Sequence, residues 1–540
     1  MIANFLLLLV LVAFVQASYT PTRGSCGGNT NLLREASGIS PGEASYVASK
    51  QSKSDSAFQD YLKHVNIPGL DVNQSANIGL SFSGGGYRAM LAGAGEFSAL
   101  DSRNEIANTM GGLLQASNYI VGCSGGGWLV GTIAMNNFPT IAEVRSNPDL
   151  WELSDNVPEL TNPRSWRAFG RYAGIVRDTL GKRLAGFRIS FTDEWGLLVG
   201  RGIVDRNGPY STWSDIKVTQ SYLSNEIPFP IIVGTTLNSA DERQAQITID
   251  NPLLEMTPIE FGSYDKSIKS FFTTSALGTS VSNGQPTSSQ CVTGFDNAKF
   301  LLGTTSSLFQ GVSGWQKALL NIVGAINGNL GPSAIYHPNP FQDASSVQAP
   351  FNSETLYATD GGYSGMVAPL WPLMQPSRKI DLVYSFDNSA GGPNNAPDGV
   401  SLDNVKQKVI SEMGEGVFPE VPSSEEFMAS YLVKPVWVGC EVSKLKKIPN
   451  SDRYVPLIIT MANHEINYNS LTNTVKMDYS SDEQTGMISN GFAIASSNGD
   501  LKWAQCVGCA GILREFQRTG QELPETCKAC LKEYCYQYSG

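Results

Sequence analysis

Histidine is the scarcest catalytic residue type in this sequence, with three among 540 residues. Charged residues are also few, at 16% of the chain, and acidic side chains outnumber basic ones to give a formal net charge of −11. This balance argues against nucleic acid as a partner and against simple electrostatic binding to anionic membranes, because both favour clusters of Lys and Arg. Any chemistry that needs an imidazole must use one of only three positions.

Long apolar runs are missing except at the N-terminus, where Phe5 to Val15 is apolar and small residues follow. This pattern predicts a secretory signal peptide over residues 1–17, cleaved after Ala17, although the usual basic start is missing. A membrane anchor is the alternative, but a span needs about 20 apolar residues. We expect no transmembrane helix further along and no lipid anchor, since the C-terminal residues are not apolar. The expected location is secreted, or alternatively the vacuolar or lysosomal lumen.

Secretion affects how the nine cysteines are interpreted. Cys123 lies in a glycine-rich turn and is expected to be a free, buried thiol. The other eight suit disulfides, although the two C-x-x-C pairs near the C-terminus also have zinc-ribbon spacing. Disulfides are favoured because the secretory pathway is oxidising. The eight are Cys26, Cys291, Cys440, Cys506, Cys509, Cys527, Cys530 and Cys535. Asn73 begins the one Asn-x-Ser/Thr sequon in the sequence, so one N-glycan is expected there.

Predicted strands alternate with predicted helices, which indicates an α/β sheet covered on both faces. No internal repeat or coiled coil interrupts this pattern. Residues 18–75 are polar and turn-rich with no clear period, and the tail from residue 503 is predicted to be a disulfide-stapled helical hairpin. Strands are predicted at residues 78–82, 119–121, 229–237, 244–250, 354–360, 379–387 and 454–461.

The stretch Gly122-Cys123-Ser124-Gly125-Gly126 matches G-x-S-x-G between a predicted strand and a predicted helix. In that context the pattern is typical of a serine nucleophile on a sharp turn. The following helix favours negative charge at Ser124 through its dipole. A flexible glycine-rich loop is the alternative interpretation.

A second glycine turn, Ser83-Gly84-Gly85-Gly86-Tyr87-Arg88, opens another predicted helix. Its backbone N–H groups could stabilise an oxyanion during acyl transfer. Arg88 suits bidentate binding of a phosphate, with a surface arginine as the alternative. The spacing of Gly84, Gly86 and Ala89 also fits a dinucleotide-binding fingerprint, but that pattern alone is weak and a soluble nicotinamide cofactor would be scarce outside the cell.

The proton acceptor for Ser124 is the open question. A triad would use histidine, and His464 follows a predicted strand in an order that suits an α/β-hydrolase. His64 and His337 lie in no convincing motif. Asp360, at the end of a strand and before two glycines, could serve as base if a partly dry site raises its pKa, although Asp-Gly is also a common turn.

Three stretches together, LSFSGGGYRAMLAGAG, GCSGGGWLVG and YATDGGYSGMVAPLWPLM, resemble the secreted fungal lysophospholipase (phospholipase B) family. The likeness extends to IEFGSYD, CVTGFDNAKFLLGTTSSLFQ, HPNPF and the cysteine-rich tail, over roughly residues 26–536. That family shares its catalytic core with cytosolic phospholipase A2. The resemblance implies a mixed central sheet flanked by helices, of the cytosolic phospholipase A2 or patatin type, with a disulfide-rich C-terminal segment.

The resemblance also implies a Ser–Asp dyad without a catalytic histidine. Carried over position by position, Ser124 matches the nucleophile and Asp360 the base. Gly85 and Gly86 match the oxyanion hole, and Arg88 matches the phosphate-contacting arginine. The expected organisation is a signal peptide (1–17), an N-terminal extension (18–75), a lysophospholipase catalytic domain (76–502) and a Cys-rich tail packed on it (503–540).

We therefore expect hydrolysis of lysophospholipid and phospholipid acyl esters at membrane or micelle surfaces, with transacylation when a lysophospholipid replaces water. No cofactor or metal is expected. Many fungal members carry several sequons and a lipid-anchor tail, whereas here we expect one N-glycan and no anchor, and no Asp-rich stretch predicts the calcium-binding domain of the cytosolic enzymes. The alternatives are an α/β-hydrolase esterase with a Ser124–Asp–His464 triad, and a non-catalytic secreted lipid-binding protein.

Overall fold

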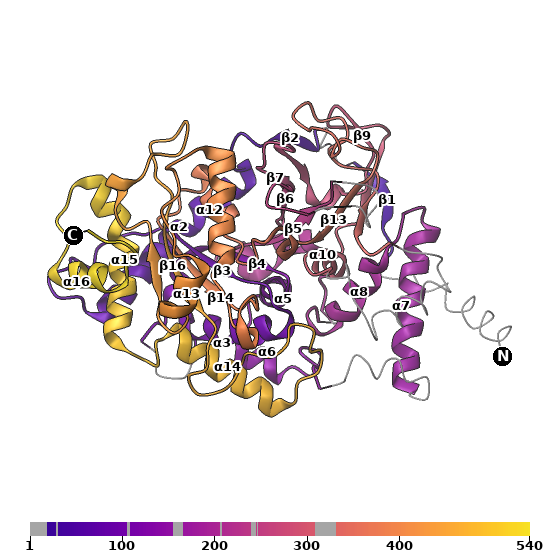
Figure 1. The fold of residues 1–540 in the computed structure, drawn as a ribbon. Helices are drawn as coiled ribbons and strands as arrows, with labels where there is room; N and C mark the ends of the chain where they lie inside the picture. Colours follow the sequence, from indigo (N-terminus) through magenta and orange to yellow (C-terminus); the bar gives the residue numbers. More distant parts are fainter. Residues whose placement is uncertain are drawn as a thin grey trace.

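A mixed sheet of 12 strands forms the centre of the computed structural model (Figure 1). The structure describes residues 19–26, 28, 31–104, 109–154, 166–205, 208–238, 245, 247–307 and 331–539. The predicted signal peptide lies outside these residues. In sheet order the main path is β15 (Val436–Val438), β16 (Leu457–Ala462), β14 (Leu382–Asp387), β3 (Ile78–Phe82), β4 (Ser117–Cys123), β5 (Phe229–Thr236), β6 (Leu253–Met256), β7 (Glu260–Ser263), β8 (Ser270–Thr273) and β2 (Leu33–Glu35).

The five strands from β16 to β5 run parallel, and the strands outside them pair antiparallel. Two further strands, β12 (Ala334–Tyr336) and β13 (Leu356–Asp360), join the sheet through pairing of β13 with β5. The expected mixed sheet is therefore confirmed. The parallel strands are buried along their whole length, as sheets covered on both faces require.

One predicted strand is wrong. Within the predicted segment 244–250, the described residues Ile247–Asp250 form a loop and turn, and the strand β6 begins only at Leu253. Asn251 closes this turn by accepting the Thr248 N–H at 2.9 Å and donating to the Thr236 carbonyl at 2.9 Å. The alternating apolar pattern was real, but a local side-chain to backbone network competed with the sheet.

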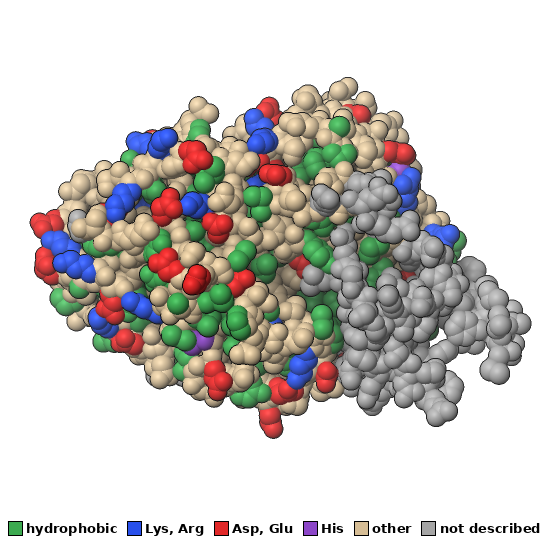
Figure 2. Space-filling view, viewed as in Figure 1, with side chains coloured by type: hydrophobic (Ala, Val, Ile, Leu, Met, Phe, Trp, Pro, Cys, Tyr) green, Lys and Arg blue, Asp and Glu red, His purple; other side chains and the backbone are tan. Residues whose placement is uncertain are grey.

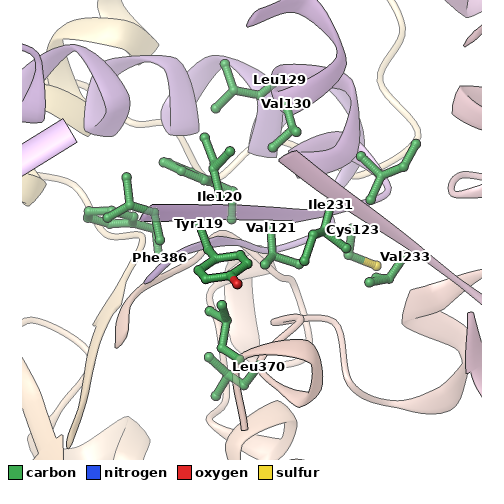
Figure 3. Packing of buried hydrophobic residues seen from close by; sticks show 14 of the residues in the cluster. Tyr119, Ile120, Val121, Cys123, Leu129, Val130, Ile231, Val233, Leu370 and Phe386 are labelled. Carbon is green, nitrogen blue, oxygen red and sulfur yellow. The ribbon is translucent and has the colours of Figure 1, made fainter. Parts of the chain in front are cut away.

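Helices cover both faces of the parallel strands (Figure 1). The helices α3 (Gly86–Leu100) and α5 (Gly125–Met135) pack together, α14 (Ser481–Ala495) packs against α3, and α2 (Pro41–Val65) contacts β4 and β5. Figure 3 shows this layering at β4: Leu129 and Val130 of α5 lie on one side of the strand, while Tyr119 points to the other side, toward Leu370. The helices α3 and α5, which follow the two glycine turns, thus lie on the same face of the sheet.

The helix α2 corrects the expectation that residues 18–75 are turn-rich. It spans 25 residues, capped by Ser40, whose hydroxyl accepts the Glu43 N–H at 3.0 Å. Its buried face carries polar side chains among the aromatic ones, which interrupts the apolar period that would reveal a helix. Each polar group has a partner. For example, Ser54 donates to Asn118 at 2.6 Å and Lys50 donates to the Glu226 carbonyl at 3.0 Å.

A buried ion cluster fixes α2 to the sheet. The Arg378 guanidinium donates to Glu43 of α2 at 2.8 Å and to Glu255 of β6 at 2.7 Å. All three side chains are buried, and the Tyr119 hydroxyl also donates to Glu43 at 3.1 Å. Removing one member of such a cluster leaves the opposite charges unpaired in the protein interior, which cannot solvate them.

The eight cysteines expected to pair form four disulfides, so the zinc-ribbon alternative is wrong. In the tail, Cys506–Cys530 and Cys509–Cys527 join α15 (Leu501–Thr519) to α16 (Glu525–Tyr534), which confirms the predicted stapled hairpin. Cys440–Cys535 ties the end of α16 to the loop after β15, and Cys26–Cys291 joins the paired strands β1 (Thr22–Ser25) and β11 (Gln290–Thr293). Cys123 is the free, buried thiol that was expected.

On the face drawn in Figure 2, basic and acidic side chains are interspersed, with apolar side chains between them. Separately, none of the described helices combines the length and apolar character needed to cross a bilayer.

Replacing Arg378 with Met should lower the free energy of unfolding by about 3–5 kcal/mol, because Glu43 and Glu255 would be left buried without a cation. Urea unfolding followed by intrinsic fluorescence measures this change. The matched control is Lys63→Met, which removes a cation from the exposed pair with Asp60 at the end of α2. The control midpoint should not move, and an equal shift in both variants would contradict a special role for the buried cluster.

Candidate active site

Ser124 lies on a strained turn between β4 and α5. Its backbone has φ 51° and ψ −117°, a left-handed conformation that costs a non-glycine residue free energy. The neighbouring glycines permit this turn by allowing close backbone contact: a Cβ at Gly126 would lie 2.2 Å from the Phe82 carbonyl oxygen. The serine side chain lines a cavity of about 320 Å³. Strand, turn and helix thus occur here as the motif predicts.

The sheet register brings Asp360 to this turn. Strand β4 pairs with β5 as far as Cys123 opposite Val233, where it gives way to the Ser124 turn. Strand β13 arrives from the other direction and ends with Asp360 opposite Gly234, the next residue of β5. The strands β4 and β13, which run in opposite directions, therefore end opposite consecutive residues of the same neighbouring strand, β5. For this reason Ser124 and Asp360 lie at the same place in the sheet, although their numbers differ by 236.

The carboxyl group of Asp360 is buried beside the Ser124 turn. Burial raises the pKa of its carboxyl to about 6, and the nearby Ser124 hydroxyl opposes that rise. Its Oδ1 accepts the Gly362 N–H at 2.7 Å and lies 3.8 Å from Sγ of Cys123. Its Oδ2 is buried and makes no well-formed hydrogen bond within the described chain. Oδ2 is therefore the carboxylate oxygen that is left to accept a further hydrogen bond in this cavity.

The glycine turn before α3 lies directly against the serine turn. Gly85 has a φ of 141° and Gly86 a φ of 64°. Glycine adopts such positive φ angles more readily than any other residue. The amides of these two glycines sit at the start of α3, where N–H groups have no intrahelical acceptor. Gly85 lines the cavity, whereas Gly86 is not among its lining residues and instead abuts Gly125, at which a Cβ would lie 2.0 Å from the Gly86 carbonyl oxygen.

Arg88 is buried on the first turn of α3 and lines the same cavity. Its guanidinium donates to the Asn388 carbonyl at 3.0 Å, to the Thr474 hydroxyl at 3.0 Å and to the Thr472 carbonyl. Burial lowers the pKa of this group to about 10, so it stays cationic at neutral pH. Its hydrogen-bond partners are all neutral, and within the described chain it has no ion-pair partner. A cavity-facing cation without a carboxylate partner is suited to an anionic ligand.

None of the three histidines lines this cavity. His64 is exposed at the end of α2, and His337 contacts Thr355 at 3.2 Å. His464 follows β16, and its Nδ1 lies 2.9 Å from the Ala462 carbonyl oxygen in a separate pocket lined by Met461 and Ile466. The geometry therefore brings Asp360 to Ser124 and leaves His464 elsewhere.

Two positioning residues escaped the sequence analysis. Thr305, just after α10 (Ala298–Thr304), accepts the Ser124 N–H at 3.1 Å and donates to the Val233 carbonyl at 2.5 Å, which locks the strained turn to β5. Asn388, just after β14, accepts from Arg88 through its carbonyl and donates its side chain to Glu96 at 3.0 Å. Both are polar residues in ordinary loop sequence, and their partners lie between 72 and 300 positions away, so no local pattern marks them.

The family model described as the lysophospholipase catalytic domain matches residues 78–539. The chain belongs to this family. Lysophospholipase 2 of Candida albicans is 36% identical over 96% of the chain and 88% of the relative's length. Lysophospholipase 1 of Candida albicans strain SC5314 / ATCC MYA-2876 is 37% identical over 99% and 93%. Lysophospholipase 1 of Saccharomyces cerevisiae is 33% identical over 96% and 83%.

The fold is also that of a solved structure, human GIVD cytosolic phospholipase A2. The two chains superpose with a TM-score of 0.66 over 91% of this chain and 72% of that one, at 14% sequence identity. The expected family and fold class are thereby confirmed, and the chain is a lysophospholipase-type enzyme. Family membership excludes two of the alternative hypotheses. One is dinucleotide binding by the Gly84–Ala89 turn, and the other is a non-catalytic lipid-binding protein.

With Asp360 as the proton acceptor, the turnover of a neutral ester should fall as the pH drops through about 6, because only the ionised carboxylate can take a proton. The measurement is kcat/KM for a short uncharged ester against pH, which should be half-maximal near pH 6 and level above it. His464→Ala should show the same acid limb. A limb near pH 4, where an ordinary aspartate titrates, would contradict the buried base.

Proposed function

We propose that this enzyme cleaves fatty-acyl esters of lysophospholipids and phospholipids through an acyl-serine at Ser124, with Asp360 as the base. The observation that carries the proposal is the end-to-end meeting of β4 and β13 on β5, which places this serine and this carboxylate on one cavity with Arg88. A Ser124–His464 triad lacks such support, since His464 lines another pocket.

In the first half-reaction, Asp360 Oδ2 takes the Ser124 proton as Oγ attacks the ester carbonyl carbon. The developing oxyanion is stabilised by the amide of Gly85, which lines the cavity, and by the amide of Gly86, the next residue of the same turn; neither N–H has an intrahelical acceptor. Arg88 holds the phosphate of the head group and so orients the ester toward Oγ. When the ester C–O bond breaks, Asp360 returns the proton to the leaving alkoxide, and a glycerophosphodiester or a lysophospholipid departs.

In the second half-reaction, water attacks the acyl-serine with Asp360 again taking a proton. When the acyl C–Oγ bond breaks, Asp360 returns the proton to Ser124 Oγ, and the products are a free fatty acid and the regenerated serine hydroxyl. If a second lysophospholipid attacks in place of water, the acyl group is transferred and a diacyl phospholipid forms. No step of this scheme requires a cofactor.

We further propose that the enzyme acts in an oxidising compartment, either outside the cell or in a vacuolar or lysosomal lumen. Four disulfides support this location, because such bonds persist poorly in a reducing cytosol. Asn73 is exposed in the loop after α2, where an N-glycan would meet solvent.

A fluorophosphonate probe should label Ser124, because such probes trap activated serines as stable esters. Peptide mapping by mass spectrometry locates the label, and Ser124→Ala should abolish both labelling and lysophospholipid turnover, by at least about 10⁴-fold. The matched control is Ser83→Ala, in the neighbouring glycine turn, which should still be labelled. A label on any other serine of the wild-type chain would overturn the assignment.

Arg88→Gln should weaken phospholipid turnover more than neutral-ester turnover, since only the phospholipid presents a phosphate to the cation. We expect kcat/KM for lysophosphatidylcholine to fall about 100-fold and that for a short uncharged ester less than about tenfold. Arg103→Gln, just beyond α3, is the control and should leave the ratio of the two unchanged. Equal losses on both substrates in Arg88→Gln would remove the phosphate role.

A further inference from the structure

A carboxylate that the catalytic scheme does not use lines the same cavity as Arg88. Asp398 lies in the loop before α12 (Val400–Met413), and its Oδ1 accepts the Val400 N–H at 3.1 Å. Within the described chain, no Lys or Arg forms an ion pair with it. The cavity therefore presents one cation and one free carboxylate besides the Ser124–Asp360 pair.

One short segment fixes the positions of these two charges. The Arg88 Nε donates to the Asn388 carbonyl at 3.0 Å. Asp398 packs against Gly391, at which a Cβ would lie 2.1 Å from Oδ2 of Asp398. Three residue steps separate Asn388 from Gly391, so their Cα atoms are at most roughly 11 Å apart.

The buried carboxylate of Asp387 supports the same placement. Burial is the main cause of the raised pKa of Asp387. The charge of Asp398 raises this pKa further, and the charge of Arg88 lowers it. Both charges thus lie within electrostatic range of one buried group. A ligand that carries two opposite charges would therefore find an opposite charge for each of them in this cavity.

The charge balance of the cavity favours a zwitterion over an anion. Its charged lining is Arg88 against Asp360 and Asp398, a formal −1 when both carboxylates are ionised. A head group that carries only negative charge satisfies Arg88 but faces Asp398 without compensation. A head group with phosphate and ammonium satisfies both, and this difference is a source of specificity.

We propose that Asp398 is a specificity residue that binds the cationic end of the head group, so that the enzyme prefers phosphocholine and phosphoethanolamine lipids over phosphoglycerol lipids. This inference rests on the proposed function, because Arg88 is taken to hold the phosphate while the ester reaches Ser124. Asparagine at position 398 preserves the shape and the acceptor for Val400 and removes only the charge.

The test compares kcat/KM for lysophosphatidylcholine and lysophosphatidylglycerol with the same acyl chain, in micelles of one neutral detergent. Wild type should favour the choline lipid, and Asp398→Asn should reduce the choline-to-glycerol ratio about tenfold, as expected for loss of a partly buried charge pair. Asp403→Asn, an exposed position on α12 outside the cavity, should keep the wild-type ratio.

An unchanged ratio in Asp398→Asn, or an equal loss on both lipids, would overturn the inference while leaving the Ser124 chemistry standing. Turnover that persists in Ser124→Ala would instead overturn the proposed function. If Asp398→Asn fails to fold, inhibition of the wild type decides: phosphocholine should compete about tenfold better than glycerol 3-phosphate at equal ionic strength, and equal inhibition would overturn the inference.

Discussion

Two backbone turns touch in this protein with no side chain between them, and the active site depends on that contact. The turn after β3 carries the Gly85–Gly86 amides and the turn after β4 carries Ser124. They are joined by the Gly126 N–H, which donates to the Ser83 carbonyl at 3.1 Å. A methyl group at Gly125 or Gly126 would overlap the opposite backbone, at 2.0 and 2.2 Å. Larger residues would push the nucleophile and the amides apart.

The second constraint is the sheet itself, whose register brings Asp360 to the Ser124 turn. Because β13 runs antiparallel and stops where β4 stops, Asp360 lines the same cavity as Ser124, and none of the three histidines lines it. Burial then raises the carboxyl pKa toward neutrality, which is the range in which a general base works best. Structural ion pairs lie elsewhere, at Arg378 under the sheet, so stability and chemistry are carried by different buried charges.

Much of this was predictable from sequence because local patterns encode it. The glycine turns, the strand before each and the helix after each follow from the two motifs, and the stapled tail follows from cysteine number and compartment. The expectation that Asp360 is the base rests on the family resemblance, since Asp-Gly alone equally predicts a turn. Its placement depends on a non-local register between β5 and β13 that no window of sequence reveals. Thr305 and Asn388 were missed for the same reason, and α2 because its buried face is partly polar.

The central claim is that an aspartate, not a histidine, takes the proton of Ser124. The most direct test measures kcat for lysophosphatidylcholine in Asp360→Asn and His464→Ala, with thermal unfolding to verify that both variants are folded. The account predicts a loss of at least about 10³-fold in Asp360→Asn and a change of less than about threefold in His464→Ala. Loss of turnover in a folded His464→Ala variant, or retained turnover in Asp360→Asn, would contradict it.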